Sequence, residues 1–231
     1  VWVRGGDPFD SHDHQDRGHV NFILAGNPVF IEAGTPAYHN PRLALDFASG
    51  RGHNVLQLGV APLPHTFSRR SLPPGWQKVG AMAPITVTLL DPRGGAMKVD
   101  GTAGYDGLKQ WLRQVTWNTR QLTVEDSVQM KTGSSQVVQF RWHLGTLRKP
   151  RIDAKGNGAC VTWPGVQVSL AADTPIDIAC EWMPDHTMQF RPWDDQRPDH
   201  QHACLVVRTR IPVVQCRITT SATGASPSPT R

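Results

Sequence analysis

The sequence of 231 residues predicts an all-β protein, a multi-stranded antiparallel β-sandwich of stacked sheets. Short apolar runs rich in Val, Ile and Leu recur along most of the chain, and turn-forming Gly, Pro and Asn residues separate them. No stretch has the spacing of a convincing amphipathic helix longer than about two turns. Many short strands with regular turn signals are typical of sandwiches and stacked sheets.

The first strands are predicted as a hairpin, because residues 20–24 and 29–31 flank the tight-turn pair Gly26-Asn27. Residues 54–60 are rich in β-formers, and residues 84–90 alternate as a half-buried strand does. The later predicted strands follow in order at residues 112–117, 121–128, 137–144, 159–163, 167–170, 176–182, 203–210 and 213–219.

The length indicates one large domain over residues 1–218, which can bury enough surface to fold without disulfides. Residues 219–231 are rich in Ser, Thr, Pro and Gly and are expected to form a disordered tail or linker. The four cysteines lack the CxxC spacing of zinc ribbons, so two disulfides and buried free thiols both stay open. They are Cys160, Cys180, Cys204 and Cys216.

The net charge of +5 and the pI of about 9.3 come from basic residues that form no single run. Scattered basic residues fit an acidic substrate at least as well as nucleic acid, and we expect no nucleic-acid partner. No apolar run approaches the ~20 residues of a membrane-spanning helix, so no membrane span is expected. The chain starts without Met or a signal peptide, which suggests a mature product or a domain of a longer polypeptide.

Potential metal ligands gather near the start of the chain, in the segment of residues 11–16. His12 and His14, two residues apart, lie on the same side of an extended strand. Glu32 and His53 would complete the mixed nitrogen and oxygen shell that zinc favours, with a position left for water or substrate. A buried carboxylate at Glu32 needs a partner, and a metal supplies one.

Four neighbouring residues are candidates to support the ligands or to contact substrate. Asp13 and Asp16 could accept hydrogen bonds from the imidazoles of the ligands. Asp16 lies on the same side of the extended strand as His14. Tyr38 could exchange a proton, although packing is its other role, and Asn54 directly follows the third histidine. Motifs of covalent catalysis such as GxSxG are missing from the sequence, so a serine or cysteine nucleophile is not expected.

These segments resemble the C-terminal β-domain of the heparinase II/III family of polysaccharide lyases. The family's His-x-His-x-Asp segment is similar to residues 12–16, its acid-Gly segment to residues 28–35 and its His-Asn segment to residues 52–56. Residues 122–126 and 140–144 resemble its later Val-x-Asp and Trp-His-Leu strands. The resemblance covers most of the first 220 residues of the chain.

The resemblance implies β-elimination on a uronate-containing acidic polysaccharide such as a glycosaminoglycan or alginate, in the periplasm, at the cell envelope or outside the cell. By matching position, His14, Glu32 and His53 would bind a metal, expected to be Zn²⁺, and His12 would be the catalytic residue facing the substrate. Family members usually carry Asp where Glu32 stands. The resemblance also implies a partner, an N-terminal α/α toroid that supplies a catalytic tyrosine; none precedes Val1, so the chain would hold half an active site.

Two other functions stay open. Residues 6–26 nearly fit the first cupin motif, which would predict a metal-dependent enzyme that uses His19 as a ligand, but the second cupin motif has no match. A non-catalytic carbohydrate-binding β-module with a structural metal is the other alternative.

Eight tryptophans support the carbohydrate-binding alternative, because exposed indole rings stack on sugars. Trp76 and Trp193, in Pro-rich loops, are the candidates for stacking. Trp111, Trp142 and Trp182 lie in predicted strands and are expected in the core.

Overall fold

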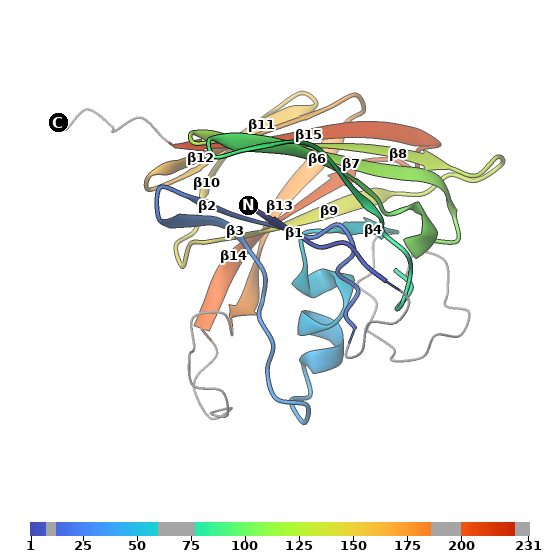
Figure 1. Ribbon diagram of the computed structural model, residues 1–231, viewed down its shortest axis with the longest axis horizontal. Helices are drawn as coiled ribbons and strands as arrows, with labels where there is room; N and C mark the ends of the chain where they lie inside the picture. Colours follow the sequence, from blue (N-terminus) through green and yellow to red (C-terminus); the bar gives the residue numbers. More distant parts are fainter. Residues whose placement is uncertain (8–12, 60–76, 186–199, 225–231) are drawn as a thin grey trace.

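The structure, a computed structural model, describes residues 1–7, 13–59, 77–185 and 200–224. Within these residues the strands pair antiparallel and form two sheets of eight and seven strands, stacked face to face as the upper and lower layers of Figure 1. The predicted all-β sandwich is therefore confirmed. No helix of the described residues is long and apolar enough to cross a membrane.

The seven-stranded sheet has the order β1-β2-β3-β9-β14-β13, and β4 also pairs with β9. Its strands are β1 (Trp2–Val3), β2 (Val20–Leu24), β3 (Asn27–Ile31), β4 (Leu56–Leu58), β9 (Val138–Leu144), β13 (Ile176–Asp185) and β14 (His200–Thr209). Strand β3 meets the end of β9 and β4 meets its start, because Ile31 pairs with His143 and Leu56 with Phe140. This pairing brings the residues after β3 close to those before β4.

The predicted hairpin at the start of this sheet is confirmed as β2 and β3. Its turn lies one residue earlier than expected, at Ala25 and Gly26, whose φ values are 48° and 82°. Two successive positive φ angles are the geometry that the tight turns of hairpins favour.

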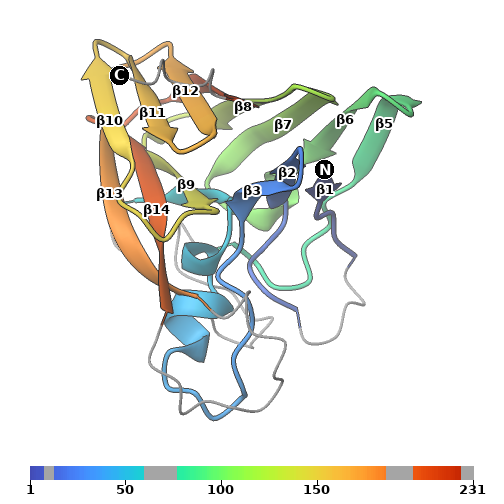
Figure 2. The same ribbon diagram turned by 90° about the vertical axis from the view of Figure 1, so that its left-hand side faces the viewer.

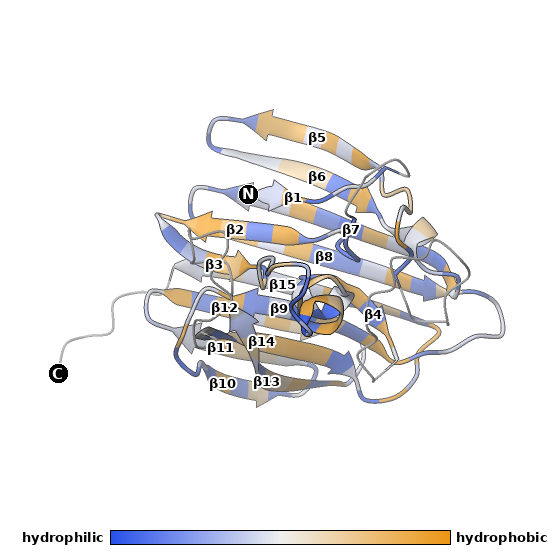
Figure 3. Ribbon diagram, turned by 90° about the horizontal axis from the view of Figure 1, so that it is seen from below, coloured by the Kyte–Doolittle hydropathy of each residue, from blue (hydrophilic) through white to orange (hydrophobic). Residues whose placement is uncertain are grey.

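The eight-stranded sheet has the order β10-β11-β12-β15-β8-β7-β6-β5. Its strands are β5 (Ile85–Asp91), β6 (Gly94–Asp100), β7 (Leu108–Asn118), β8 (Gln121–Met130), β10 (Arg151–Lys155), β11 (Gly158–Trp163), β12 (Val166–Ala172) and β15 (Gln215–Gly224). Along the strands of both sheets hydrophobic and hydrophilic residues alternate, as Figure 3 shows, so each sheet turns one face to the core.

Two expectations about this sheet were wrong. Strand β5 was predicted to be half-buried, but all its residues are exposed because it forms the edge of the sheet. The tail was predicted to begin at residue 219, but β15 continues to Gly224 between β8 and β12. Residues 225–231 lie outside the described residues.

The core lies between the two sheets and includes the indole rings of Trp111 and Trp142, which are fully buried as expected. Trp182 was also expected there, but it is 40% exposed because β13 is the last strand of its sheet. The four cysteines are free, so the disulfide alternative was wrong. Burial raises the pKa of the Cys204 thiol to about 11, as expected for an inert packed side chain.

A buried arginine joins the two sheets. Arg113 of β7 forms a bidentate ion pair with Asp126 of β8, with nitrogen–oxygen distances of 2.8 and 2.9 Å. Its guanidinium lies 5.2 to 5.4 Å from the ring centres of Trp111, Phe140 and Trp142. Because Phe140 and Trp142 belong to β9 of the other sheet, this cage fixes one sheet against the other.

Short helical turns cover the outer face of the seven-stranded sheet (Figures 1 and 2). They are the π-helical turn η1 (Leu43–Phe47) and the 3₁₀ turn η2 (Gly50–Gly52); a third turn, η3 (Thr102–Gly104), precedes β7. Leu43, Phe47 and Ala48 form a small apolar cluster with Ala33, which follows β3. This cluster holds the cover against the segment that carries Glu32.

Candidate functional site

Three of the predicted ligands, His14, Glu32 and His53, lie next to one another. The ring centres of His14 and His53 are 5.4 Å apart, and Oε2 of Glu32 is 3.6 Å from Nδ1 of His53. The three residues come from the loop before β2, the end of β3 and the turn between η2 and β4. The sheet pairing around β9 therefore assembles a site from segments far apart in the sequence. His12 lies outside the described residues.

His53 is buried, and neither of its ring nitrogens has a hydrogen-bond partner among the described residues. Leaving a buried polar group unpaired costs about 1–3 kcal/mol, so such a group calls for an explanation. The nearby imidazole of His53 lowers the pKa of the Glu32 carboxyl to about 2, against the opposing effect of burial. Glu32 is therefore an ionised carboxylate that lies beside the imidazole of His53, 3.6 Å from its Nδ1.

These donors suit a divalent metal in their chemistry. Two ligands of one tetrahedral zinc ion lie roughly 3.4 Å apart when each bond is about 2.0–2.1 Å, close to the separation of Glu32 and His53. In the described part of the chain no group of three or more His, Cys, Asp or Glu side chains is arranged to hold a metal ion. The third donor, His14, would have to move closer to complete a shell.

His14 and Glu32 line a pocket of about 330 Å³ whose walls are mostly polar and aromatic, and His53 lies next to these two residues. Trp2 and Tyr38 line it with exposed fractions of 48% and 72%, and Arg4 adds a positive charge. The packing alternative for Tyr38 was therefore wrong. Sequence reasoning missed Trp2, which stands in the two-residue strand β1. The expected stacking residues Trp76 and Trp193 lie outside the described residues.

Asp13 and Asp16 bind arginines instead of the imidazoles. Nη1 and Nη2 of Arg17 each donate to Asp13 at 2.7 Å, and the backbone N–H of Gly80 donates to the same carboxylate at 2.7 Å. Asp16 accepts from Arg17 at 3.1 Å and lies 3.4 Å from Arg4. The expectation that they orient the histidines was wrong; they fix the loop that carries His14.

Asn54 is a fully buried link between strands. Its side-chain amide donates to the carbonyls of Val20 and Ile31 at 2.8 and 2.7 Å, and its Oδ1 accepts from the backbone N–H of His143 at 2.6 Å. With its amide engaged by β2, β3 and β9, it cannot bind substrate. It positions the adjacent His53 instead.

His19 is buried and uses both ring nitrogens in hydrogen bonds. Its Nδ1 accepts from the backbone N–H of Asn54 at 2.8 Å, so Nε2 carries the proton and donates to Oδ1 of Asn21 at 2.9 Å. Neither nitrogen is left for a metal. The ligand set expected for a cupin therefore does not form here.

Two further buried histidines, His143 and His202, are hydrogen-bonded to each other. Nε2 of His143 donates to the carbonyl of Arg51 at 2.9 Å, so its Nδ1 accepts from Nε2 of His202 at 2.7 Å. Burial and the neighbouring His202 hold the pKa of His143 well below its ordinary value. Burial likewise lowers the pKa of His19 to about 4.

Acidification is expected to destabilise the protein through the buried histidines His19 and His143. Their pKa values are lower in the folded than in the unfolded chain, so below about pH 6.5 the unfolded state binds more protons and stability falls with pH. Each histidine contributes up to about 1.4 kcal/mol per pH unit. Urea unfolding between pH 7 and 4 measures this slope; His19→Gln should flatten it, whereas the exposed His39→Gln should not. An unchanged slope in His19→Gln would contradict the assignment.

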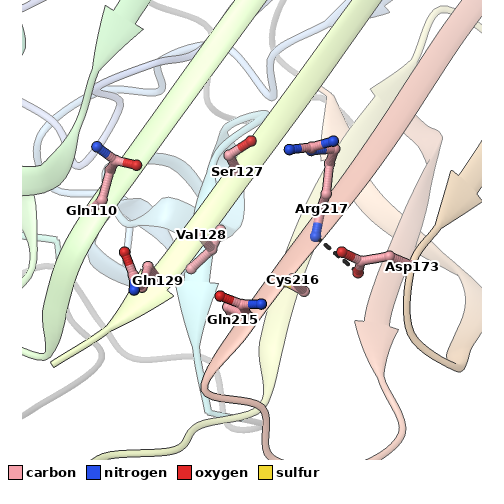
Figure 4. Close-up of a pocket in the computed structure, with 8 residues that line it drawn as sticks. All are labelled: Gln110, Ser127, Val128, Gln129, Asp173, Gln215, Cys216 and Arg217. Atoms are coloured by element: carbon pink, nitrogen blue, oxygen red, sulfur yellow. Dashed lines mark hydrogen bonds between the residues drawn. The ribbon is translucent and has the colours of Figure 1, made fainter. Parts of the chain in front are cut away.

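Another pocket lies on the outer face of the eight-stranded sheet (Figure 4). Gln110, Gln129 and Gln215 stand side by side there, because their strands pair in that register. The backbone N–H of Arg217 donates to Asp173 at 2.9 Å (Figure 4). None of its lining residues is a histidine, so this pocket lacks the proton-transfer groups that the first one has.

Comparisons with known proteins agree with the fold. The family model described as Heparinase II/III-like, C-terminal, matches residues 2–196. The structure is similar to heparan sulfate lyase HepC from Pedobacter heparinus, with a TM-score of 0.69 and 11% identity over 99% of this chain and 33% of that one. It is also similar to a crystal structure of heparinase III, with a TM-score of 0.64 and 13% identity over 98% of this chain and 32% of that one.

The chain thus spans about a third of the length of these solved structures, and at such identities their likeness shows the fold alone. No curated protein sequence matches the chain. The family model covers most of the residues, including the segments of His14, Glu32 and His53. The chain therefore belongs to the heparinase II/III-like C-terminal family.

Proposed function

We propose that the chain is the β-domain of a lyase that cleaves uronate-containing acidic polysaccharides, of the glycosaminoglycan or alginate type, by β-elimination. The observation that carries the proposal is the meeting of His14, Glu32 and His53 beside a pocket that also presents Arg4 and an exposed Trp2. An α/α toroid is the proposed partner that completes the active site. We also propose that the protein acts in the periplasm, at the cell envelope or outside the cell, where such polymers would be met.

The pocket offers the groups that this chemistry needs. Elimination removes the C5 proton of a uronate and breaks the C4–O4 bond of the same uronate, so that O4 leaves with the neighbouring sugar and takes up a proton. A base, an acid and a charge that neutralises the carboxylate must therefore lie together. Arg4 is the positive charge in the pocket wall, and it is held by Asp13 and Asp16 at 3.6 and 3.4 Å. His12, two residues before His14, is the proposed residue for proton transfer.

We further propose that His14, Glu32 and His53 hold a Zn²⁺ ion. When bound, the ion would supply a fixed positive charge and tie the loop of His14 to the segments after β3 and before β4. The unused nitrogens of His53 and the ionised state of Glu32 support this role. The Asp13–Arg17 ion pair already joins the residues before and after His14. A bound ion would add a second restraint, through the side chain of His14 itself.

A non-catalytic carbohydrate-binding domain is the second candidate function. The half-exposed indole of Trp2 at the pocket favours it, because sugar rings stack on such surfaces. Both candidates bind saccharide at the same pocket. They differ in whether the histidines are needed for cleavage.

Metal content tests the site first. Elemental analysis by inductively coupled plasma mass spectrometry is expected to find about one zinc ion per chain in the purified wild type. The variants His14→Ala and His53→Ala are expected to lose this zinc. The matched control is His39→Ala, which removes an exposed histidine next to Tyr38 in the sequence. This variant should keep the zinc. A wild type without metal, or metal that survives His53→Ala, would contradict the zinc site.

Cleavage by the full-length protein then separates the two functions. The ultraviolet absorbance of the new C4=C5 double bond follows the reaction, and oligosaccharide binding is measured in parallel. For a lyase, His53→Ala should abolish cleavage while Trp2→Ala weakens binding. Binding without any cleavage by the full-length wild type would instead favour the carbohydrate-binding function.

A further inference from the structure

A third pocket, of about 210 Å³, lies on the outer face of the seven-stranded sheet, over β9, β13 and β14. The register of β13 and β14 places its lining residues in cross-strand pairs: Asp177 pairs with Arg208, and Ala179 pairs with Val206. The small apolar side chains of Ala179 and Val206 leave room between taller polar neighbours. The walls are formed by Arg51, Gln139, Arg141, Asp177, Glu181 and Arg208.

Two of its guanidinium groups are held rigidly with part of their hydrogen-bonding capacity unused. Nη1 of Arg141 donates to Glu181 at 2.9 Å, while its side chain is only 3% exposed. Nη1 of Arg51 lies 2.9 Å from Asp46, and its Nη2 lies 3.8 Å from Glu181. The Nε atoms of Arg51 and Arg141 have no hydrogen-bond partner among the described residues, but they are shielded from solvent, so a ligand would be bound through the other guanidinium nitrogens.

Among the residues that the structure describes, arginines outnumber carboxylates in and around this pocket. Glu181 and Asp46 already pair with arginines, and Asp177 accepts from Arg210 at 2.9 Å. The linked groups are the five guanidiniums of Arg42, Arg51, Arg141, Arg208 and Arg210 and the three carboxylates of Asp46, Asp177 and Glu181. Of the three arginines that line the pocket, Arg208 is the most open to a ligand, because its side chain is 48% exposed, against 25% for Arg51 and 3% for Arg141.

We propose that this pocket binds an anionic group, the sulfate or carboxylate of an acidic saccharide, as a second contact separate from the histidine pocket. Planar guanidiniums recognise both groups through paired hydrogen bonds. The carboxylates of Glu181 and Asp177 keep the arginines in place and stay on their own partners. The saccharide class rests on the proposed function, whereas the anion site rests on the arginines alone.

Occupation of the pocket would also steady the segment that carries His53. Arg51 belongs to η2, which leads into His53, and its carbonyl accepts the hydrogen bond from His143. An anion held by Arg51 would therefore restrain η2 through its side chain as well as its backbone. The second contact would therefore stabilise the position of His53 and also strengthen the binding of the polymer.

The test measures binding of a heparan sulfate hexasaccharide and of an unsulfated uronate hexasaccharide to the full chain. Arg208→Gln is expected to weaken binding about fivefold to tenfold, the loss of one charge-assisted hydrogen bond. Arg141→Gln should do the same if it folds. Arg151→Gln, an exposed arginine of β10 in the other sheet, removes the same charge and should have no such effect.

The arms of this experiment separate the possible sources of the anion. A loss confined to the heparan sulfate sugar assigns the pocket to sulfate, and a loss for both sugars assigns it to carboxylate. Amide resonances of Ala179 and Val206 should shift on binding. Equal effects of Arg208→Gln and Arg151→Gln, or unshifted resonances, would overturn the proposal. In His53→Ala the effect of Arg208→Gln should persist, so failure of the metal site and failure of the anion site are distinguishable.

Discussion

Replacing Arg113 with alanine is expected to destabilise the protein by about 3–5 kcal/mol, the cost of breaking a buried ion pair. The change leaves the carboxylate of Asp126, which is 1% exposed, with only the indole N–H of Trp111 as a hydrogen-bond donor in the core. It also removes the donor to the carbonyls of Gly18 and Asn54. The empty space between three aromatic rings adds a cavity cost.

Thermal and urea unfolding measure this loss. For a chain of this size we expect a fall in Tm of roughly 6–20 °C, from about 2–4 °C for each kcal/mol. Arg120→Ala, at the exposed turn between β7 and β8, is the matched control and should change Tm by little. The double variant Arg113→Met with Asp126→Leu should be more stable than Arg113→Ala, because it buries no unpaired charge. A Tm equal to that of the control would contradict the bridging role of Arg113.

Local patterns predicted most strands, because the alternation of side chains and the turn residues are properties of short segments. Strand β6 was missed because Gly94-Gly95 is a poor strand signal. The structure needs those glycines, since a side chain at Gly95 would clash with the ring of Trp117 on β7. The exposure of β5 could not be predicted either, because edge position depends on how all strands are ordered.

The candidate site divides in the same way. The resemblance to the heparinase II/III family implied that His14, Glu32 and His53 would meet, and these three residues do lie together in the structure. The partners of Asp13 could not be predicted from the sequence. Asp13 binds Arg17 and the backbone N–H of Gly80, and these groups meet only once the loop has folded. The same holds for Asn54, whose partners lie on β2, β3 and β9 and meet only in the folded sheet.

Replacing Asn54 with leucine is expected to cost about 3 kcal/mol or more, because it leaves three buried backbone groups without partners at about 1–3 kcal/mol each. The groups are the carbonyls of Val20 and Ile31 and the N–H of His143. Leucine has the same branched arrangement of four heavy side-chain atoms, so the steric effect of the substitution should be smaller than the loss of the hydrogen bonds. The large expected loss therefore separates hydrogen bonding from packing at this position.

The same substitution should also disturb the histidine site, which makes it a test of how the site is built. Asn54 fixes the chain directly after His53, and without it the β3 and β4 segments lose their common anchor. We expect Asn54→Leu to lower zinc affinity measured on the folded fraction, beyond the loss in urea stability. Asn27→Leu, at the exposed first residue of β3, is the control and should change neither quantity. If Asn54→Leu bound zinc as the wild type does, the link between this strand anchor and His53 would be wrong, and the loop held by Asp13 and Arg17 would remain as the element that positions the site.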